Sequence, residues 1–428
     1  MNIQDIHNLF LQCSSLSIDT RKIEKNSMFF AIKGENFDAN TFAKEALDLG
    51  ALFVVIDNES YFIDDRTILV KNSLETLQEL AKFHRSYLAL PIVALTGSNG
   101  KTTTKELINV VLSKKFKTKA TIGNLNNHIG VPLTLLSFTK ETEIGIVEMG
   151  ANHQKEIEFL CQIAQPDFGY ITNFGKAHLE GFGGVEGVIA GKSEMYQYLA
   201  ANQKTVFVNL EDPIQIEKSK GIKSFTFGVK KENADLNIQN ITANPFVAID
   251  YNDFTIESHL IGLYNANNIN AATAIGKYFD VKESDIKSAI ENYIPANNRS
   301  QMMQKGSNEI ILDAYNANPS SMAVAITNFL QLDKENKIMI LGDMFELGDE
   351  SLHEHKVIVD SLADQNQALC FLIGKAFFAN KISNQNIQFF ETFDAFADFL
   401  KTFKFGSNMI LIKGSRGMAL ERTLDYIQ

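Results

Sequence analysis

The sequence is poor in cysteine and has no long apolar run. Its three cysteines, Cys13, Cys161 and Cys370, lie far apart, which excludes a disulfide framework and a clustered zinc site. No run of about 18 apolar residues occurs, so we expect no membrane span. The first residues also lack the basic and then apolar pattern of a secretory signal. These absences favour a cytoplasmic protein with reduced thiols.

An excess of basic residues is lacking as well. The net charge of −11 argues against a general nucleic-acid binder, because such proteins neutralise phosphates with basic patches. Apolar residues make up 45% and charged residues 21%, which is typical of a soluble globular protein. At roughly 150 residues per domain, a chain of 428 residues predicts three domains.

The sequence also lacks internal repeats, low-complexity segments and long linkers, so domain boundaries follow from changes of pattern. Residues 1–87 mix short apolar runs with helical stretches. Residues 88–295 begin with strands that alternate with helices, which predicts a mostly parallel sheet, and turn strand-rich at 205–260. Residues 296–428 hold buried strands at 309–312, 337–341, 369–373 and 409–412. We therefore predict three consecutive α/β domains, the last of them Rossmann-like.

A glycine-containing loop separates an apolar strand from a helix predicted at 101–114. It reads Thr96-Gly97-Ser98-Asn99-Gly100-Lys101-Thr102-Thr103. Its glycines allow backbone N–H groups to close on phosphate oxygens, and the helix N-terminus adds partial positive charge. Lys101 would reach the β- and γ-phosphates, and the Thr102 hydroxyl would bind Mg²⁺. Leu95 stands where the general pattern has its first glycine. A polar turn is the alternative, but the strand and helix on either side favour phosphate binding.

Metal-competent residues follow two later strands. Glu148 ends the strand at 143–149, and His178 follows the strand at 168–173. Open α/β sheets bind ligands at the carboxyl ends of their strands. Taken singly, Glu148 would be interpreted as a capping or exposed acid, and His178 as an ordinary loop histidine. After a phosphate loop, the pair favours a Mg²⁺ site. The residue pattern alone indicates a surface lysine at Lys192.

Two asparagine-rich segments complete the candidates. One, at 262–272, enters a predicted helix and contains Asn268; the other, at 313–320, follows a buried strand and contains Asp313, Asn316, Asn318 and Ser320. Side-chain amides can pair with an adenine edge or a peptide ligand. Asparagine is equally suited to helix caps and turns, so the residues alone leave both interpretations open.

Taken in order, these motifs resemble those of the Mur ligase family of peptidoglycan synthesis, over nearly the whole chain. The resemblance extends to further segments: 17–21 (SIDTR), 29–34 (FFAIKG), 123–127 (GNLNN), 148–151 (EMGA), 192–194 (KSE), 341–344 (LGDM) and 413–417 (KGSRG). The segment 315–320 (YNANPS) is similar to that of the members that add D-Ala-D-Ala to UDP-MurNAc-tripeptide. Each segment is weak alone, and the ordered set is strong.

The resemblance implies a role for each matching position. Residues 97–103 would hold the ATP phosphates, Asn268 would contact adenine and Asp313 the ribose, and Arg299 would meet the γ-phosphate. Thr102 and Glu148 would bind one Mg²⁺, while His178 and a carbamylated Lys192 would bind a second. Thr20 and Arg21 would contact the UDP-sugar, and Asn316, Asn318 and Ser320 the dipeptide. The implied catalytic set is Lys101, Glu148, His178, Lys192 and Arg299.

The implied reaction is ATP-dependent amide-bond formation through an acyl phosphate, by a monomer acting on small-molecule substrates. Departures from the family pattern are Tyr264 in place of a histidine, Ala314 beside Asp313, and Ala39-Asn40 in place of Gly-His.

Three alternatives remain. Folylpolyglutamate synthase shares the phosphate loop but lacks a full domain before it. The ligase that adds the third amino acid shares that domain but would not be expected to carry 315–319. A non-catalytic nucleotide-binding scaffold would not need the implied catalytic set.

Overall fold

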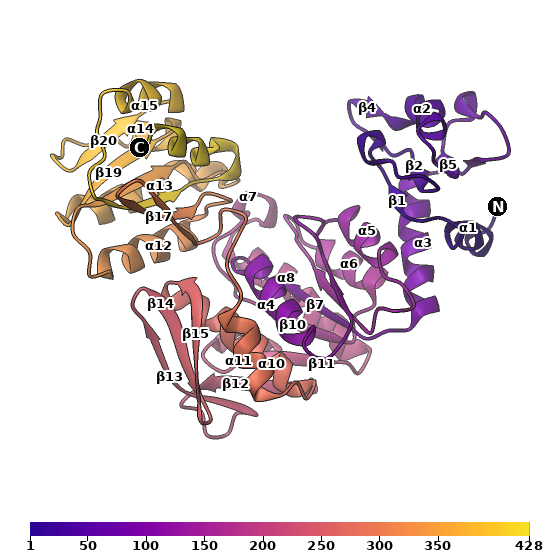
Figure 1. Cartoon of the computed structure of the whole chain (residues 1–428), viewed down its shortest axis with the longest axis horizontal. Helices are drawn as coiled ribbons and strands as arrows, with labels where there is room; N and C mark the ends of the chain where they lie inside the picture. The colour runs from indigo at the N-terminus through magenta and orange to yellow at the C-terminus, as the bar shows by residue number, and fades with distance from the viewer. Residues whose placement is uncertain (428) are drawn as a thin grey trace.

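The computed structural model describes residues 1–427, in which three α/β units follow one another along the chain (Figure 1). The first unit has a parallel sheet ordered β1-β2-β5-β6 and a separate β3–β4 ribbon. The bounds are α1 Ile3–Phe10, β1 Leu16–Ser17, β2 Met28–Phe30, β3 Lys33–Gly34, β4 Phe37–Asp38, α2 Ala43–Asp48, β5 Phe53–Ile56, β6 Thr67–Leu69 and α3 Ser73–Leu88. The strand β2 is buried throughout, as its apolar run predicts.

The central unit is built on a nine-stranded sheet ordered β15-β14-β13-β12-β11-β10-β7-β9-β8. Neighbouring strands from β13 to β8 are parallel, and β13–β14 and β14–β15 are antiparallel. The strands are β7 Ile92–Thr96, β8 Thr118–Ala120, β9 Ile144–Glu148, β10 Phe168–Ile171, β11 Thr205–Asn209, β12 Ser224–Val229, β13 Leu236–Ala243, β14 Phe246–Tyr251 and β15 Phe254–Ile261. The helices are α4 Lys101–Leu112, α5 Gly130–Leu136, α6 Glu156–Ala164, α7 Leu179–Phe182, α8 Val185–Ala201, α9 Pro213–Lys218, α10 Ala266–Tyr278 and α11 Glu283–Glu291.

The C-terminal unit has a six-stranded sheet ordered β16-β17-β21-β18-β19-β20, parallel except for the edge strand β16. Its strands are β16 Gln301–Lys305, β17 Asn308–Asp313, β18 Lys337–Gly342, β19 Ala368–Ile373, β20 Ile387–Phe390 and β21 Met409–Lys413. Its helices are α12 Pro319–Gln331, α13 Ser351–Ala363, α14 Lys375–Ala379 and α15 Phe393–Leu400. The four strands expected in this region are confirmed, and together the units confirm three consecutive α/β domains.

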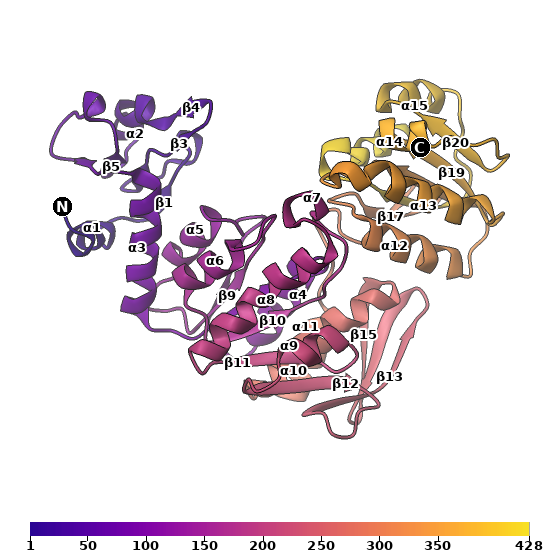
Figure 2. The same cartoon turned by 180° about the vertical axis from the view of Figure 1, so that it is seen from behind.

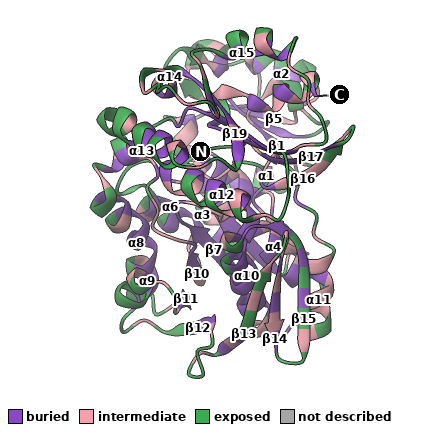
Figure 3. Ribbon diagram, turned by 90° about the vertical axis from the view of Figure 1, so that its left-hand side faces the viewer, coloured by how far each residue is buried: buried purple, intermediate pink, exposed green. Residues whose placement is uncertain are grey.

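The core of each unit lies along its sheet. Figure 3 shows β7 and β10 buried at the centre, while the short helix α9 is largely exposed. Two free cysteines, Cys161 and Cys370, are buried, and Cys13 is partly buried. Within residues 1–427, no helix is both long and apolar enough to cross a membrane. Figures 1 and 2 both place α7 where the central and C-terminal units meet.

Candidate active site

A cavity of about 880 Å³ lies between the central and C-terminal units. On the central side, it is lined by the loop after β7 and by residues that follow β9 and β10. On the other side, it is lined by the linker at 299–300, the segment after β17 and the end of β21. The carboxyl ends of parallel strands thus meet at this cavity, as open α/β sheets predict for a ligand site.

The phosphate loop is tied to the end of β10. Gly97 has φ 141°, and a Cβ added there would lie 2.0 Å from Thr172 Oγ1, so no larger residue fits without a shift. The Thr172 hydroxyl donates to the Asn99 carbonyl at 2.6 Å. The Asn173 side chain accepts from Asn99 N–H at 3.0 Å and donates to Asn99 O at 3.0 Å. No ligand role was predicted for Thr172 and Asn173, although they directly follow β10, the strand beside β7.

Lys101 lies at the start of α4, with its ammonium folded onto the loop. Its Nζ donates to Gly97 O at 2.6 Å and to Ser98 O at 3.3 Å. Burial lowers the pKa of Lys101; the Glu148 carboxylate opposes this shift and the nearby Arg299 charge adds to it. Two cations therefore converge beside one carboxylate, which favours a polyanionic ligand such as a triphosphate.

Glu148 is almost fully buried, with 2% of its surface exposed. Its Oε1 accepts from Asn126 Nδ2 at 2.8 Å and from Thr102 Oγ1 at 3.3 Å. Its Oε2 is buried without a hydrogen-bond partner in the described part of the chain. A buried, unpartnered carboxylate oxygen beside a threonine hydroxyl suits a hard divalent cation. The interpretation of Glu148 as an exposed acid is therefore wrong, and Asn126 is a supporting residue to which the sequence assigned no role.

His178 lines the same cavity in a left-handed backbone conformation, with φ 53°. Its Nδ1 lies against the Glu346 carboxylate of the C-terminal unit, and the ring lowers the pKa of Glu346. The Nδ1 atom is not aligned for a hydrogen bond, so the contact with Glu346 is electrostatic. Across residues 1–427, no group of three or more His, Cys, Asp or Glu side chains forms a metal cluster. A cation here would thus depend on mixed ligands.

Lys192 is fully buried in α8, so the expectation of a surface lysine is wrong. Its Nζ donates to Ala151 O at 3.1 Å and lies 4.9 Å from the centre of the Phe182 ring. Burial and the charge of Lys101 hold the pKa of Lys192 well below its usual value. The amine lies behind Ala151, which lines the cavity. Sequence periodicity missed this burial because α8 packs against α6 on a face that carries polar residues.

The candidates for base and ribose lie on the two sides of the cavity. Asn268 donates to Asn265 Oδ1 at 2.8 Å and accepts from Thr104 Oγ1 at 3.0 Å. Asp313 pairs with Lys413 at 2.6 Å and accepts from Ser300 N–H at 3.0 Å. Tyr264, which stands in place of the family's histidine, connects the two sides of the cavity, because its hydroxyl lies 2.8 Å from Ser300 Oγ. Burial raises the pKa of the Tyr264 hydroxyl.

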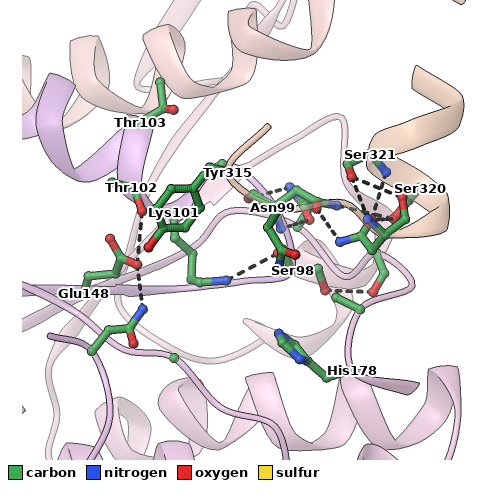
Figure 4. Close-up of a pocket in the computed structure, with 18 of the residues that line it drawn as sticks. Ser98, Asn99, Lys101, Thr102, Thr103, Glu148, His178, Tyr315, Ser320 and Ser321 are labelled. Atoms are coloured by element: carbon green, nitrogen blue, oxygen red, sulfur yellow. Dashed lines mark hydrogen bonds between the residues drawn. The ribbon is translucent and has the colours of Figure 1, made fainter. Parts of the chain in front are cut away.

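Asn318 and Ser320 contact the phosphate loop directly. Figure 4 shows Ser320 on the side of the pocket where Asn99 lies. Asn318 Nδ2 donates to Asn99 Oδ1 at 2.7 Å, and Asn99 Nδ2 donates to Ser320 Oγ at 3.3 Å. Asn318 also caps α12 through Ser321 N–H at 2.9 Å, so the capping interpretation holds for this residue. Asn316 lines the cavity and is exposed.

Thr20 and Arg21 lie outside this cavity, in a short 3-10 turn of the first unit. Arg21 makes a bidentate pair with Asp19 at 2.9 and 2.8 Å. The departure at Asn40 is structural, because its buried side chain bonds to Asp38 and Asp57.

Comparisons with known proteins agree with this geometry. The Mur ligase middle domain matches residues 95–276, and the Mur ligase, glutamate ligase domain matches residues 298–416. UDP-N-acetylmuramoyl-tripeptide–D-alanyl-D-alanine ligase of Bacillus subtilis is 32% identical, over 95% of this chain and 91% of that protein. A crystal structure of MurF from Acinetobacter baumannii has a TM-score of 0.86 at 31% identity, covering 99% of this chain and 97% of its own. MurF ligase from Thermotoga maritima in complex with ADP has a TM-score of 0.83 at 26% identity, covering 97% of each chain.

Proposed function

The chain belongs to the Mur ligase family of ATP-dependent, amide-bond-forming enzymes, and we propose that it joins D-Ala-D-Ala to UDP-MurNAc-tripeptide. The observation that carries this proposal is similarity to a ligase of that specificity over 95% of the chain, which includes the N-terminal unit. Folylpolyglutamate synthase lacks a full domain before its phosphate loop, so this coverage argues against that alternative. The product would be the pentapeptide precursor of peptidoglycan, with ADP and phosphate.

The proposed reaction has two steps. The terminal carboxylate of the tripeptide attacks the γ-phosphorus of ATP, which gives an acyl phosphate and ADP. The amine of D-Ala-D-Ala then attacks the acyl carbon, and phosphate leaves from the tetrahedral intermediate. An anionic nucleophile and a polyphosphate repel each other, so the protein must mainly position and neutralise them. Lys101, Arg299 and the N-terminus of α4 are the groups we assign to this task.

We propose that residues 97–103 hold the phosphates, with Asn268 at the adenine and Asp313 at the ribose. The amides of 97–103 lie at the start of α4, where backbone donors and the helix dipole favour phosphate. Asn268 keeps one side-chain N–H beyond those used by its protein partners. Asp313 accepts from Lys413 and Ser300 through different oxygens, and each oxygen can accept one further hydrogen bond, such as that of a ribose hydroxyl.

We propose that Thr102 and Glu148 hold one Mg²⁺, which would neutralise phosphate charge when bound. The donor set fits, because Glu148 Oε2 is buried without a partner beside the Thr102 hydroxyl. His178 and Lys192 are proposed for a second Mg²⁺. An ammonium cannot bind a cation, but a neutral amine can react with CO₂ to give an anionic carbamate. The lowered pKa of Lys192 supports that assignment.

The remaining substrate assignments are proposals of the same kind. Thr20 and Arg21 would contact the UDP-sugar, and Asn316, Asn318 and Ser320 the dipeptide. Of these three side chains, that of Asn316 is the most available to a ligand, because Asn318 and Ser320 already contact Asn99. A cytoplasmic monomer that acts on small molecules fits the proposal.

An omission assay tests the function. Phosphate release should require UDP-MurNAc-tripeptide, D-Ala-D-Ala, ATP and Mg²⁺ together, with lysine and diaminopimelate tripeptides tested in parallel. No turnover with either tripeptide, or equal turnover with glutamate and a folate, would overturn it. Lys101→Ala should lower turnover by about a thousandfold or more, since it removes a preorganised charge from the transition state. Lys114→Ala, just beyond α4, is the matched control and should leave turnover unchanged.

A further inference from the structure

Arg299 is partly buried and has no acidic partner among the residues that the structure describes. Its Nε is buried without a hydrogen-bond partner in the described part of the chain. Its guanidinium carbon lies 3.6 Å from the centre of the Tyr315 ring. An aromatic face attracts a guanidinium through its quadrupole while leaving the N–H donors at the edge unused. The ring contact thus holds the arginine in place while its charge is not neutralised by a carboxylate and its edge N–H donors remain available to a ligand.

A second arginine at the same ring makes the contrast clear. Arg416 lies farther from the Tyr315 ring, at 5.8 Å, and its guanidinium pairs with Glu421 at 2.9 Å. Only Arg299 of these two combines close stacking with the absence of a carboxylate. Arg299 and Tyr315 both line the cavity that contains Lys101, whereas Arg416 does not.

The backbone links Tyr315 to the same linker. Tyr315 N–H donates to Asn298 O at 3.2 Å, directly before Arg299. The residues around Arg299 have left-handed conformations, with φ 68° at Asn297, 55° at Asn298 and 47° at Ser300. Such conformations are sparsely populated and persist where the surroundings specify them. The ring and the backbone contact therefore join Arg299 to the C-terminal unit rather than to the phosphate loop.

We propose that Tyr315 is a positioning residue that holds Arg299 by its ring face, so that an unpaired edge of the guanidinium faces the terminal phosphate of ATP. This role of Tyr315 rests on the proposed function, because it assumes that Arg299 contacts the γ-phosphate. ADP lacks that phosphate, so the ring matters for binding of the triphosphate and not of the diphosphate. Tyr315 thereby sets how well the site distinguishes ATP from ADP.

The test measures binding of ADP and of a non-hydrolysable ATP analogue, with Mg²⁺, by calorimetry on the full chain. Tyr315→Leu should weaken binding of the analogue by about tenfold, or about 1.4 kcal/mol, as expected for a partly buried cation–π contact, and leave binding of ADP nearly unchanged. Tyr315→Phe keeps the ring and should restore the ratio. Phe393→Leu is the matched control, because Arg422 stacks on that ring at 3.7 Å, away from the cavity.

A second measurement separates positioning from general destabilisation. In an Arg299→Ala background, Tyr315→Leu should have no further effect on the ratio, because Tyr315 acts through the arginine. Arg299→Lys, which lacks the planar guanidinium, should reproduce the loss even if Tyr315→Leu fails to fold. Equal weakening of both nucleotides, or equal defects in Tyr315→Phe and Tyr315→Leu, would overturn the proposal. These experiments need no peptide substrate, so their failure is distinguishable from failure of the omission assay.

Discussion

The two boundaries between the units differ in their chemistry. At the first, the long helix α3 packs against α5 and α6 of the central unit, and each of these helices buries apolar residues. At the second, polar side chains carry much of the contact, as between Asn99 and Asn318 and between Lys176 and Glu354. Apolar burial favours a permanent joint, whereas polar contacts around a cavity can be exchanged for water or ligand. We infer that the first boundary is rigid and the second opens and closes during turnover.

Buried polar groups lock the first boundary. Arg85 in α3 donates to Ala164 O at 3.1 Å and Gln165 O at 3.0 Å, and pairs with Asp167 at 2.8 Å. His7 Nε2 lies 3.0 Å from His84 Nδ1, and His84 Nε2 lies 3.0 Å from the Phe138 carbonyl. Because a carbonyl only accepts, His84 Nε2 must carry the proton and its Nδ1 must accept from His7.

The largest effect should follow from breaking the Arg85 contacts. Arg85→Ala removes the guanidinium that pairs with Asp167 and donates to the carbonyls of Ala164 and Gln165. The loss of these buried contacts should lower the free energy of unfolding by about 3–5 kcal/mol. Urea unfolding would measure this. Arg66→Ala, at an exposed pair with Asp64, is the matched control and should cost less than about 1 kcal/mol. Equal losses in the two variants would contradict a locked first boundary.

The histidine pair should make the same boundary sensitive to acid. Burial, with a smaller contribution from His84, lowers the pKa of His7 to about 4 from its usual 6.5. The unfolded chain therefore binds a proton that the folded chain does not, and stability falls as pH drops from about 6.5 to about 4, by roughly 3 kcal/mol. Urea unfolding across this range should show that slope, and His7→Phe should reduce it. A slope unchanged by His7→Phe would assign the acid sensitivity elsewhere.

A smaller effect, on catalysis rather than stability, is expected at the second boundary. Asn99→Ala removes the amide that bonds to both Asn318 and Ser320. Closure of the C-terminal unit should be disfavoured by about 1–2 kcal/mol, which corresponds to a tenfold or so fall in kcat. ADP binding should be retained, because the Asn99 backbone contacts remain. A loss of thermal stability instead of kcat would mean that this boundary is as permanent as the first.

The smallest effect is expected at Lys176 and Glu354. Their contact of 2.6 Å joins a half-exposed lysine to a buried carboxylate. Lys176→Ala should lower kcat by about two- to fivefold, since ion pairs with one exposed partner contribute about 1 kcal/mol or less. The effect should shrink at high salt, which screens such a pair. A salt-independent defect would point to a role for Lys176 in substrate contact instead.

Much of the fold was predictable because its signals are local. The buried strands expected at 309–312 and 409–412 are β17 and β21, and the helix expected at 101–114 is α4. Apolar runs of strand length and a glycine loop before a helix need no knowledge of distant residues. The edge strand β16, which alternates little in burial, has no comparable signal. Such a strand is defined by its partner, β17.

The phosphate loop, the order of the three α/β units and the ligase resemblance were determined by the sequence itself. Only the tertiary structure decided that Lys192 is buried, that Glu148 retains an unpartnered oxygen, and that Tyr315 lies under Arg299. The reason is physical. A motif records which groups are available, whereas burial and pairing depend on residues that approach from other elements, and these determine the charge and donors that each group can offer a ligand.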